Sequence, residues 1–215
     1  WSYFDTYNTH SYAWDLQYYD LWKPVRQAAC GRPIWLTESD RGIKYQGDSP
    51  WCDFDSFHED RKAEFITHSY AASLFAGVNR HFHFILGHYT EERTHKIQFG
   101  LLRLDYTPRK SYVALSAVGR LLAGAKALGR WNSDNKNENA HVYAFRAEPD
   151  GIQRDVLVCW SEKKGGWADK GKLKLQNNLP QNLKPLKVYD YLGRDIGKEM
   201  PEKFTGDAFF VLLKP

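Results

Sequence analysis

The sequence predicts an α/β fold in residues 1–130, followed by a small antiparallel β-sandwich in residues 131–215. In the first region, short apolar or β-branched runs alternate with long segments whose apolar residues recur every three or four positions. This alternation is the pattern of parallel βαβ units with helical crossovers. In the second region the helical period disappears, and short strand-like runs are separated by turn residues. The polar run NSDNKNEN at 132–139 marks the expected boundary.

The first half of the α/β region contains a strand, a helix and a second strand. The β-branched and aromatic run at 4–10 predicts the first strand. A helix is expected at 14–29, although Pro24 should kink or split it, and Gly31 stands where a left-handed C-cap belongs. The almost wholly apolar run at 33–37 is typical of a parallel strand that is buried on both faces.

The second half continues the alternation. A helix is expected at about 57–78, after a polar loop, and a third strand at 81–86. Thr107 and Pro108 predict an N-cap followed by proline at the first helical position, so a third helix should begin there and end near Gly129. Three parallel strands are too few for a usual α/β sheet, which suggests that the sheet is part of a larger one.

Beyond the polar run the sequence predicts only short strands. Turn residues such as Pro149-Asp150-Gly151 separate them. The expected strands are at 141–147, 155–160, 173–175, 186–191 and 208–213.

The composition excludes several classes of function. With 42% hydrophobic and 26% charged residues, the chain has a usual globular composition. No apolar run approaches the roughly 18–20 residues of a membrane helix, so no membrane partner is expected. The first residues lack the charged start and apolar core of a signal peptide. The net charge of +4 is spread along the chain, which does not favour nucleic-acid binding.

No metal or other cofactor is expected either. The three cysteines form neither a disulfide framework nor a metal-ligand spacing. His81 and His83 share one face of their strand, but no third ligand has a suitable spacing. Which face of this strand points toward the helices is left open by the sequence.

Candidate reactive residues lie at the ends of the expected parallel strands, where such folds gather functional side chains. His10 and Tyr12 end the first strand, Glu38 the second, and His88 and Tyr89 the third. Glu38 is the sharpest candidate, because a carboxylate directly after an apolar run is costly to desolvate unless partners surround it. From position alone, a helix N-cap or a paired loop charge explains Glu38 equally well.

Three segments resemble glycoside hydrolase clan A, whose (β/α)8 barrels include families 5, 39 and 42. GRPIWLTES (31–39) resembles the seventh barrel strand, which ends in the nucleophilic glutamate. FDTYNTHSY (4–12) resembles the sixth strand, and FGLLRLDYTPRKSYVALSAVGRLL (99–122) resembles the segment that enters the eighth helix. The C-terminal β-sandwich, with VYDYLGRDI (188–196), is similar to a common accessory of these barrels.

The resemblance implies a fold and an activity. Residues 1–130 would be the C-terminal part of a TIM barrel, about strands 6–8, and the protein a polysaccharide-degrading hydrolase that is secreted or periplasmic. Glu38 would be the nucleophile of a retaining glycosidase, which uses two carboxyl groups about 5–5.5 Å apart. Tyr12 could donate a hydrogen bond to Glu38, and His10, on the same strand face, could bind a sugar hydroxyl. An aromatic core role for Tyr12 and an internally paired His10 stay open.

Aromatic residues near Glu38 are candidate sugar platforms, because apolar sugar faces pack on aromatic rings. Clan members often carry a tryptophan near the end of the strand that corresponds to 81–86, and here FILGHY has none. His88 or Tyr89 could substitute for it. Tyr45 and Trp51, in the loop after Glu38, are alternative stacking surfaces, although Trp51 could equally pack within its loop.

The acid/base glutamate of the clan is missing from its expected context. It follows an asparagine at the end of the fourth strand, whereas the Asn137-Glu138 pair of this chain lies in the polar boundary run. A complete barrel takes about 250 residues. We therefore expect an N-terminal barrel segment, on the same or a separate chain, as a partner that supplies this glutamate, besides the carbohydrate substrate.

Three functions remain open at this point. The favoured one is the nucleophile-bearing part of a retaining glycoside hydrolase. The second is a non-catalytic carbohydrate-binding or scaffold protein derived from a glycosidase barrel. The third is an unrelated α/β domain that mediates contacts with other proteins.

Overall fold

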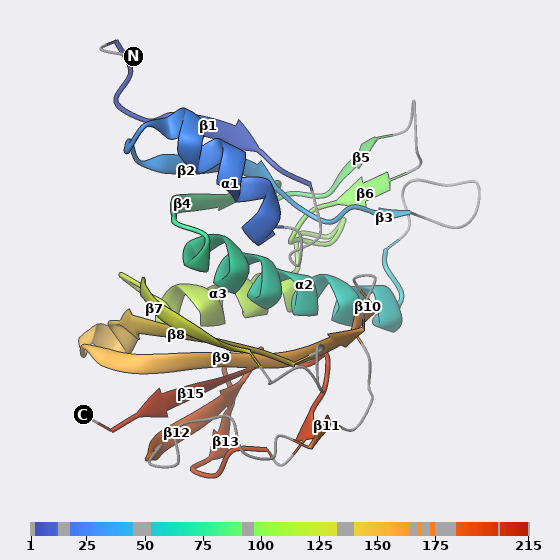
Figure 1. Ribbon diagram of the computed structural model, residues 1–215. Coiled ribbons are helices and arrows are strands. Elements are labelled where there is room, and N and C mark those ends of the chain that lie inside the picture. The colour runs from blue at the N-terminus through green and yellow to red at the C-terminus, as the bar shows by residue number, and fades with distance from the viewer. Residues whose placement is uncertain are drawn as a thin grey trace. The chain divides into compact units, whose positions relative to one another are not determined.

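The computed structural model forms two compact units, Trp1–Leu115 and Ser116–Pro215. It describes residues 3–12, 18–44, 53–91, 97–132, 140–163, 167–168, 173–174, 184–201 and 203–214 (Figure 1). The division falls inside helix α3 (Lys110–Leu121). The boundary expected at residue 130 stays a prediction.

The first unit contains a parallel sheet in which β2 (Ile34–Ser39) is the central strand. Its neighbours are β1 (Tyr7–His10) and β4 (Val78–His83), so the order is β1-β2-β4 (Figure 1). In the chain, α1 (Tyr18–Ala29) lies between β1 and β2, and α2 (Ser56–Phe75) between β2 and β4. The predicted alternation of parallel strands and helices is confirmed.

Helix α1 ends as the sequence indicates. Gly31 has a φ of +80°, and Cys30 before it also has a positive φ. Pro24 lies within one helix over Tyr18–Ala29, so it does not split the described part of that helix. Arg26, in its last turn, donates a hydrogen bond from Nη1 to the carbonyl of Ala76 at 2.8 Å, which ties α1 to the end of α2.

Helix α2 begins at an Asp55 N-cap, whose side chain accepts from the backbone N–H of His58 at 2.8 Å. Every residue of α2 from Lys62 to Ser73 is buried. This part of the helix is therefore buried on all sides, whereas an amphipathic helix buries only one apolar stripe. It ends three residues earlier than expected, because Gly77 takes a φ of +97° and Val78 already pairs with Ile34 in β4.

A small antiparallel sheet follows the carboxyl ends of β2 and β4. Its order is β3 (Ile43–Lys44), β6 (Ile97–Phe99) and β5 (Tyr89–Glu91). The register places Tyr89 opposite Phe99. The sequence indicated only loops here, because strands of two or three residues are too short to show an alternating pattern.

The expected start and end of the third helix were both wrong. Helix α3 begins at Lys110, and the Thr107 hydroxyl donates to Asp105 at 2.6 Å instead of capping the helix. The helix ends at Leu121, because Gly124 takes a φ of +63° and the chain then enters β7 (Lys126–Asn132). The apolar residues that extended the helical pattern belong to this turn and strand.

The second unit is built on an antiparallel sheet with the strand order β13-β12-β15-β9-β8-β7, with β10 paired to β9. Phe204, on a separate two-stranded pairing of β11 with β14, is fully buried in the apolar cluster that also holds Leu157 and Val211. No helix in the described ranges is long and apolar enough to cross a membrane. The remaining strands are β8 (Ala140–Ala147), β9 (Arg154–Lys163), β10 (Trp167–Ala168), β11 (Leu173–Lys174), β12 (Pro185–Asp190), β13 (Asp195–Gly197), β14 (Lys203–Phe204) and β15 (Phe209–Leu213).

Candidate functional site

The candidate site lies at the carboxyl end of the parallel sheet, where β1 and β2 end together. His10 is the register partner of Glu38, after a register shift between Thr9 and His10. The backbone N–H of Ser11 donates to the carbonyl of Glu38 at 2.9 Å. The chain that follows β1 is therefore tied to the last residues of β2, beside the Glu38 side chain.

Two side chains from the first strand segment hold the Glu38 carboxylate. The Tyr12 hydroxyl donates to Oε2 at 2.8 Å, and Nδ1 of His10 lies 3.1 Å from the same oxygen. The His10 and Glu38 side chains remain 55% and 36% exposed, so the carboxylate can be reached from solvent. Helix α2 is capped by Asp55, so Glu38 does not serve as the cap of that helix.

The Tyr12 phenol is a stable neutral donor. Burial raises its pKa well above the ordinary value, and the hydrogen bond to Glu38 and the negative charge of Glu38 raise it further. A neutral phenol can donate to a carboxylate over the whole range of ordinary pH. The hydrogen bond from Tyr12 to Glu38 that the sequence suggested is present in the structure.

Aromatic rings surround Tyr12. Phe84, directly after β4, and Phe99, on β6, meet the Tyr12 ring edge-on with centroids 6.2 and 6.0 Å away. Tyr89, on β5, packs edge-on against Phe84 at 5.6 Å. We call these four residues the aromatic cluster. Tyr12 and Tyr89 are each nearly half exposed, and Tyr12 joins the cluster to Glu38.

Phe84 and Phe99 were missed by sequence reasoning. Phe84 belongs to the run HFHFIL, in which alternation alone leaves open which face meets Glu38. Phe99 lies in a strand of three residues that shows no periodic pattern. Tyr45 and Trp51, the other expected platforms, lie outside the described residues.

His88 is held by protein groups on both ring nitrogens. Nδ1 lies 3.4 Å from Nη2 of Arg109, and Nε2 lies 3.2 Å from the Thr90 hydroxyl. The role of His88 in sugar binding stays a prediction. Its neighbour Tyr89 belongs to the aromatic cluster through its contacts with Phe84 and Phe99.

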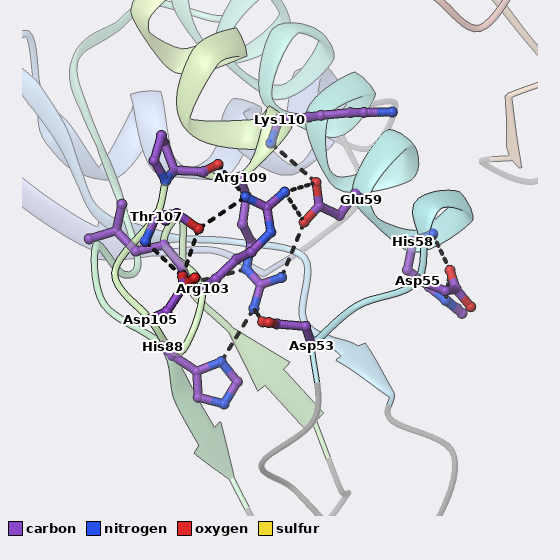
Figure 2. Close-up of polar contacts among 12 residues, drawn as sticks. Asp53, Asp55, His58, Glu59, His88, Arg103, Asp105, Thr107, Arg109 and Lys110 are labelled. Atoms are coloured by element: carbon purple, nitrogen blue, oxygen red, sulfur yellow. Dashed lines mark hydrogen bonds and ion pairs between the residues drawn. The ribbon is translucent and has the colours of Figure 1, made fainter.

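A network of charged residues centres on the fully buried guanidinium of Arg109 (Figure 2). Its Nη2 donates to Asp53 at 2.8 Å, its Nη1 lies 3.4 Å from Glu59, and its Nε donates to the carbonyl of Leu102 at 3.1 Å. The guanidinium also lies 4.0 Å from the centroid of the Phe54 ring. Burial lowers the pKa of Arg109, and the two carboxylates oppose that effect.

Further ion pairs extend the network along the segment before α3 (Figure 2). Arg103 donates to the Glu59 carboxylate at 2.7 Å and to the carbonyl of Pro108 at 2.6 Å. Lys110 pairs with Asp60 at 2.5 Å. The network fixes the segment before α3 against the start of α2. Because Arg109 also contacts His88, it links this scaffold to the chain that carries Tyr89.

The two histidines of β4 face α2. His81 stacks on Tyr70 of α2, with centroids 3.8 Å apart and planes within 3°, and its Nδ1 lies 2.8 Å from the Ser73 hydroxyl. Phe82, between the histidines, is nearly half exposed and lies 6.1 Å from Trp35 on the opposite face of the sheet. Within the described part of the chain, no group of three or more histidine, cysteine or acidic residues could hold a metal ion.

Comparisons with known proteins show a similarity in fold. No family model and no curated protein matches the sequence. A family 39 glycoside hydrolase from the gut symbiont Bacteroides cellulosilyticus WH2 aligns over 94% of this chain with a TM-score of 0.56 and 16% identity. SrfJ from Salmonella typhimurium aligns over 97% of it with a TM-score of 0.52 and 13% identity.

The chain spans less than half the length of both solved structures, 38% of the first and 40% of the second. At these identities the likeness concerns the fold alone. The protein therefore has a mixed α/β fold that resembles part of a glycoside hydrolase.

Proposed function

We propose that this chain carries the nucleophile of a retaining glycoside hydrolase and that Glu38 is that nucleophile. The observation that supports the proposal most is the arrangement around Oε2 of Glu38. A neutral Tyr12 phenol donates to this oxygen, and His10 lies beside it, at the carboxyl end of the central parallel strand. Such a carboxylate is oriented and open to solvent, as a nucleophile must be.

The chemistry takes two steps. A carboxylate oxygen of Glu38 attacks the anomeric carbon, the bond to the leaving oxygen breaks, and a second carboxylic acid gives that oxygen its proton. In the second step the same second residue removes a proton from water, which attacks the anomeric carbon and releases Glu38. Tyr12 holds the carboxylate in place for its attack in the first step, because the neutral phenol donates a hydrogen bond to it.

The aromatic cluster gives the site a surface on which a sugar could stack. Tyr12 and Tyr89 are each nearly half exposed, Tyr12 contacts the Glu38 carboxylate, and pyranose rings pack their C–H faces on aromatic rings. We therefore place the substrate among oligosaccharides or polysaccharides.

We further propose that the second carboxylate comes from a barrel segment outside these residues, on the same or a separate chain. In the described sheet, β1 and β4 each pair with β2 alone, so each leaves an edge at which another strand could pair. The coverage of 38% and 40% of the two similar structures supports the same view.

The experiment that tests the function traps the covalent intermediate. The whole protein is incubated with a panel of 2-deoxy-2-fluoroglycosyl fluorides, which form slowly hydrolysed glycosyl-enzymes with retaining glycosidases. We expect a mass increase on the peptide that contains Glu38, and none in Glu38→Gln. The exposed Glu148→Gln variant is the matched control and should be labelled like the parent. Labelling of a different carboxylate, with Glu38→Gln still reactive, would contradict the assignment.

A second candidate is a non-catalytic carbohydrate-binding or scaffold protein. It is favoured by Tyr12 and Tyr89, two half-exposed aromatic residues that would serve binding whether or not a second carboxylate is present. Saturable binding of an oligosaccharide that Tyr89→Ala weakens, without turnover or labelling in the whole protein, would support this candidate over the hydrolase.

A further inference from the structure

Three consecutive residues at the end of β2 are held by three different sets of partners. Glu38 contacts His10 and Tyr12, whereas the side chains of Ser39 and Asp40 are buried on the side of α2. We propose that Ser39 and Asp40 are positioning residues that fix Glu38 relative to Tyr12, an inference that rests on the proposed role of Glu38.

Ser39 anchors the end of β2 to β4. Its hydroxyl forms a short hydrogen bond with Nε2 of His81, and Nδ1 of His81 in turn contacts the hydroxyl of Ser73 on α2. The imidazole of His81 stacks on the Tyr70 ring, and the Tyr70 hydroxyl donates to the His81 carbonyl at 3.2 Å. Burial lowers the pKa of His81, so this anchor is a neutral ring that keeps its hydrogen bonds across ordinary pH.

Asp40, the residue after Ser39, anchors the chain to α2. Its carboxylate pairs closely with Nζ of Lys62, and both side chains are completely buried. The backbone N–H of Arg41 donates to Oδ1 at 2.6 Å, and Nε2 of His83 lies 3.3 Å from the same oxygen. Burial lowers the pKa of His83, so the positive charge that faces Asp40 comes from Lys62.

The Asp40–Lys62 pair is costly to bury, which argues for a specific purpose. Burial raises the pKa of Asp40 and lowers that of Lys62, while their mutual contact opposes both changes. Replacing a buried ion pair with apolar residues is often neutral or favourable for stability. A buried ion pair that involves Asp40, two residues after the candidate nucleophile, is therefore better explained by the geometry that it imposes.

The backbone transmits this anchoring to the site. The carbonyl of Glu38 accepts from Ser11, and the carbonyl of Ser39 accepts from Phe84, both at 2.9 Å. Glu38 is thus fixed on one side to the segment that carries Tyr12, and Ser39 on the other side to the backbone of Phe84, a residue of the aromatic cluster. A shift of Ser39 or Asp40 would change the distance between Glu38 and Tyr12 without altering either residue.

The test reads the Tyr12–Glu38 hydrogen bond directly, without requiring activity. Tyrosine labelled with ¹³C at Cζ is incorporated into the whole protein, and Tyr12→Phe identifies the Tyr12 resonance. Glu38→Ala defines the resonance position of Tyr12 without its partner. The two test variants are Ser39→Ala and the double variant Asp40→Leu/Lys62→Met, which removes both buried charges. The control is Asp60→Leu/Lys110→Met, which removes a half-exposed ion pair that also involves α2.

We expect both test variants to melt cooperatively and to move the Tyr12 resonance at least halfway toward its position in Glu38→Ala. The control should leave the resonance in place. In hydrolysis assays the test variants should lose about tenfold to a hundredfold in kcat with little change in KM, as expected for a misplaced reacting group.

A folded Ser39→Ala variant with the parent Tyr12 resonance would overturn the proposal, and so would the same result in the double variant. If the double variant fails to fold, the Tyr12 resonance of Ser39→Ala alone decides the proposal. This variant removes a single hydroxyl and is expected to fold. An absence of hydrolysis in the parent would overturn the proposed function but leave the resonance readable, so the two failures can be told apart.

Discussion

The hydroxyl of Tyr12 lies 2.8 Å from Oε2 of Glu38, although the residues are separated by 26 positions in the sequence. The parallel pairing of β1 with β2 brings them together, because both side chains lie near the same end of adjacent strands. The contact joins a neutral donor to a solvent-accessible carboxylate. Three of the predictions below depend on these two residues.

Glu38→Gln should abolish glycoside hydrolysis by the whole protein and leave its fold intact. The amide is nearly isosteric with the carboxylate and can still accept from Tyr12, but it cannot act as the nucleophile. Steady-state kinetics and circular dichroism measure the two effects. Glu38→Ala should be partly rescued by azide, with a glycosyl azide as product. Activity within about tenfold of the parent would rule Glu38 out as the nucleophile.

Tyr12→Phe should weaken kcat/KM by about 1–3 kcal/mol of transition-state free energy, the range for losing a hydrogen bond to a charged group. The free energy of unfolding should hardly change, because the ring and its contacts with Phe84 and Phe99 remain. Both quantities can be measured on the same preparation. An unaltered rate combined with a large loss of stability would show that Tyr12 is a core residue.

The Tyr12 phenol should ionise at a higher pH than free tyrosine, whose pKa is about 10. Its pKa is raised in the folded protein, so its contribution to stability is complete below the unfolded pKa and is lost as the pH rises through the folded one. An NMR titration of ¹³Cζ-labelled tyrosine measures the pKa. Glu38→Gln should lower it toward the ordinary value. A Tyr12 pKa that is insensitive to this change would mean that the carboxylate does not act on the phenol.

Lys62→Met should reduce the free energy of unfolding by about 3–5 kcal/mol, because it leaves Asp40 as an unpaired buried charge. Adding Asp40→Leu should recover most of that loss, since an apolar pair of similar volume replaces the ion pair. Denaturant titrations measure both values. Lys110→Met, which breaks the half-exposed pair with Asp60, should cost only about 0–1 kcal/mol. Equal effects of the two lysine variants would contradict the burial of Lys62.

Residues 1–215 alone should not hydrolyse glycosides, because the acid/base carboxylate is proposed to come from another segment. Size-exclusion chromatography and mass spectrometry of active material should find that segment joined to or bound by this chain. A 25.0 kDa monomer that hydrolyses a glycoside by itself would refute the proposal.

The parallel strands could be predicted from sequence because they depend on patterns that span many residues, whereas the Glu38–Tyr12 contact was expected from the resemblance of residues 4–12 and 31–39 to glycoside hydrolase strands. The apolar run before Glu38 identifies a buried strand, and the alternation of side chains along a strand places His10 and Tyr12 on one face. The structure brings all three together.

Other features could not be predicted, because no local pattern specifies them. The β3-β6-β5 sheet consists of strands of two and three residues, whose pairing depends on contacts far apart in the chain. Lys62 occupies a helix position that propensity would leave in solvent, and only the fold brings Asp40 to it. The apolar residues after α3 continue a helical period until the positive φ of Gly124 interrupts it.

The short turn between α3 and β7 limits how the chain can be divided for separate expression. β7 starts five residues after the helix ends, and the backbone N–H of Glu148 bonds the carbonyl of Ala123 inside that turn. A cut after residue 130 would take most of β7 away from β8 and leave an open strand edge prone to aggregation. A C-terminal fragment intended to stay soluble should begin ahead of α3, so that the helix, the turn and β7 are retained together.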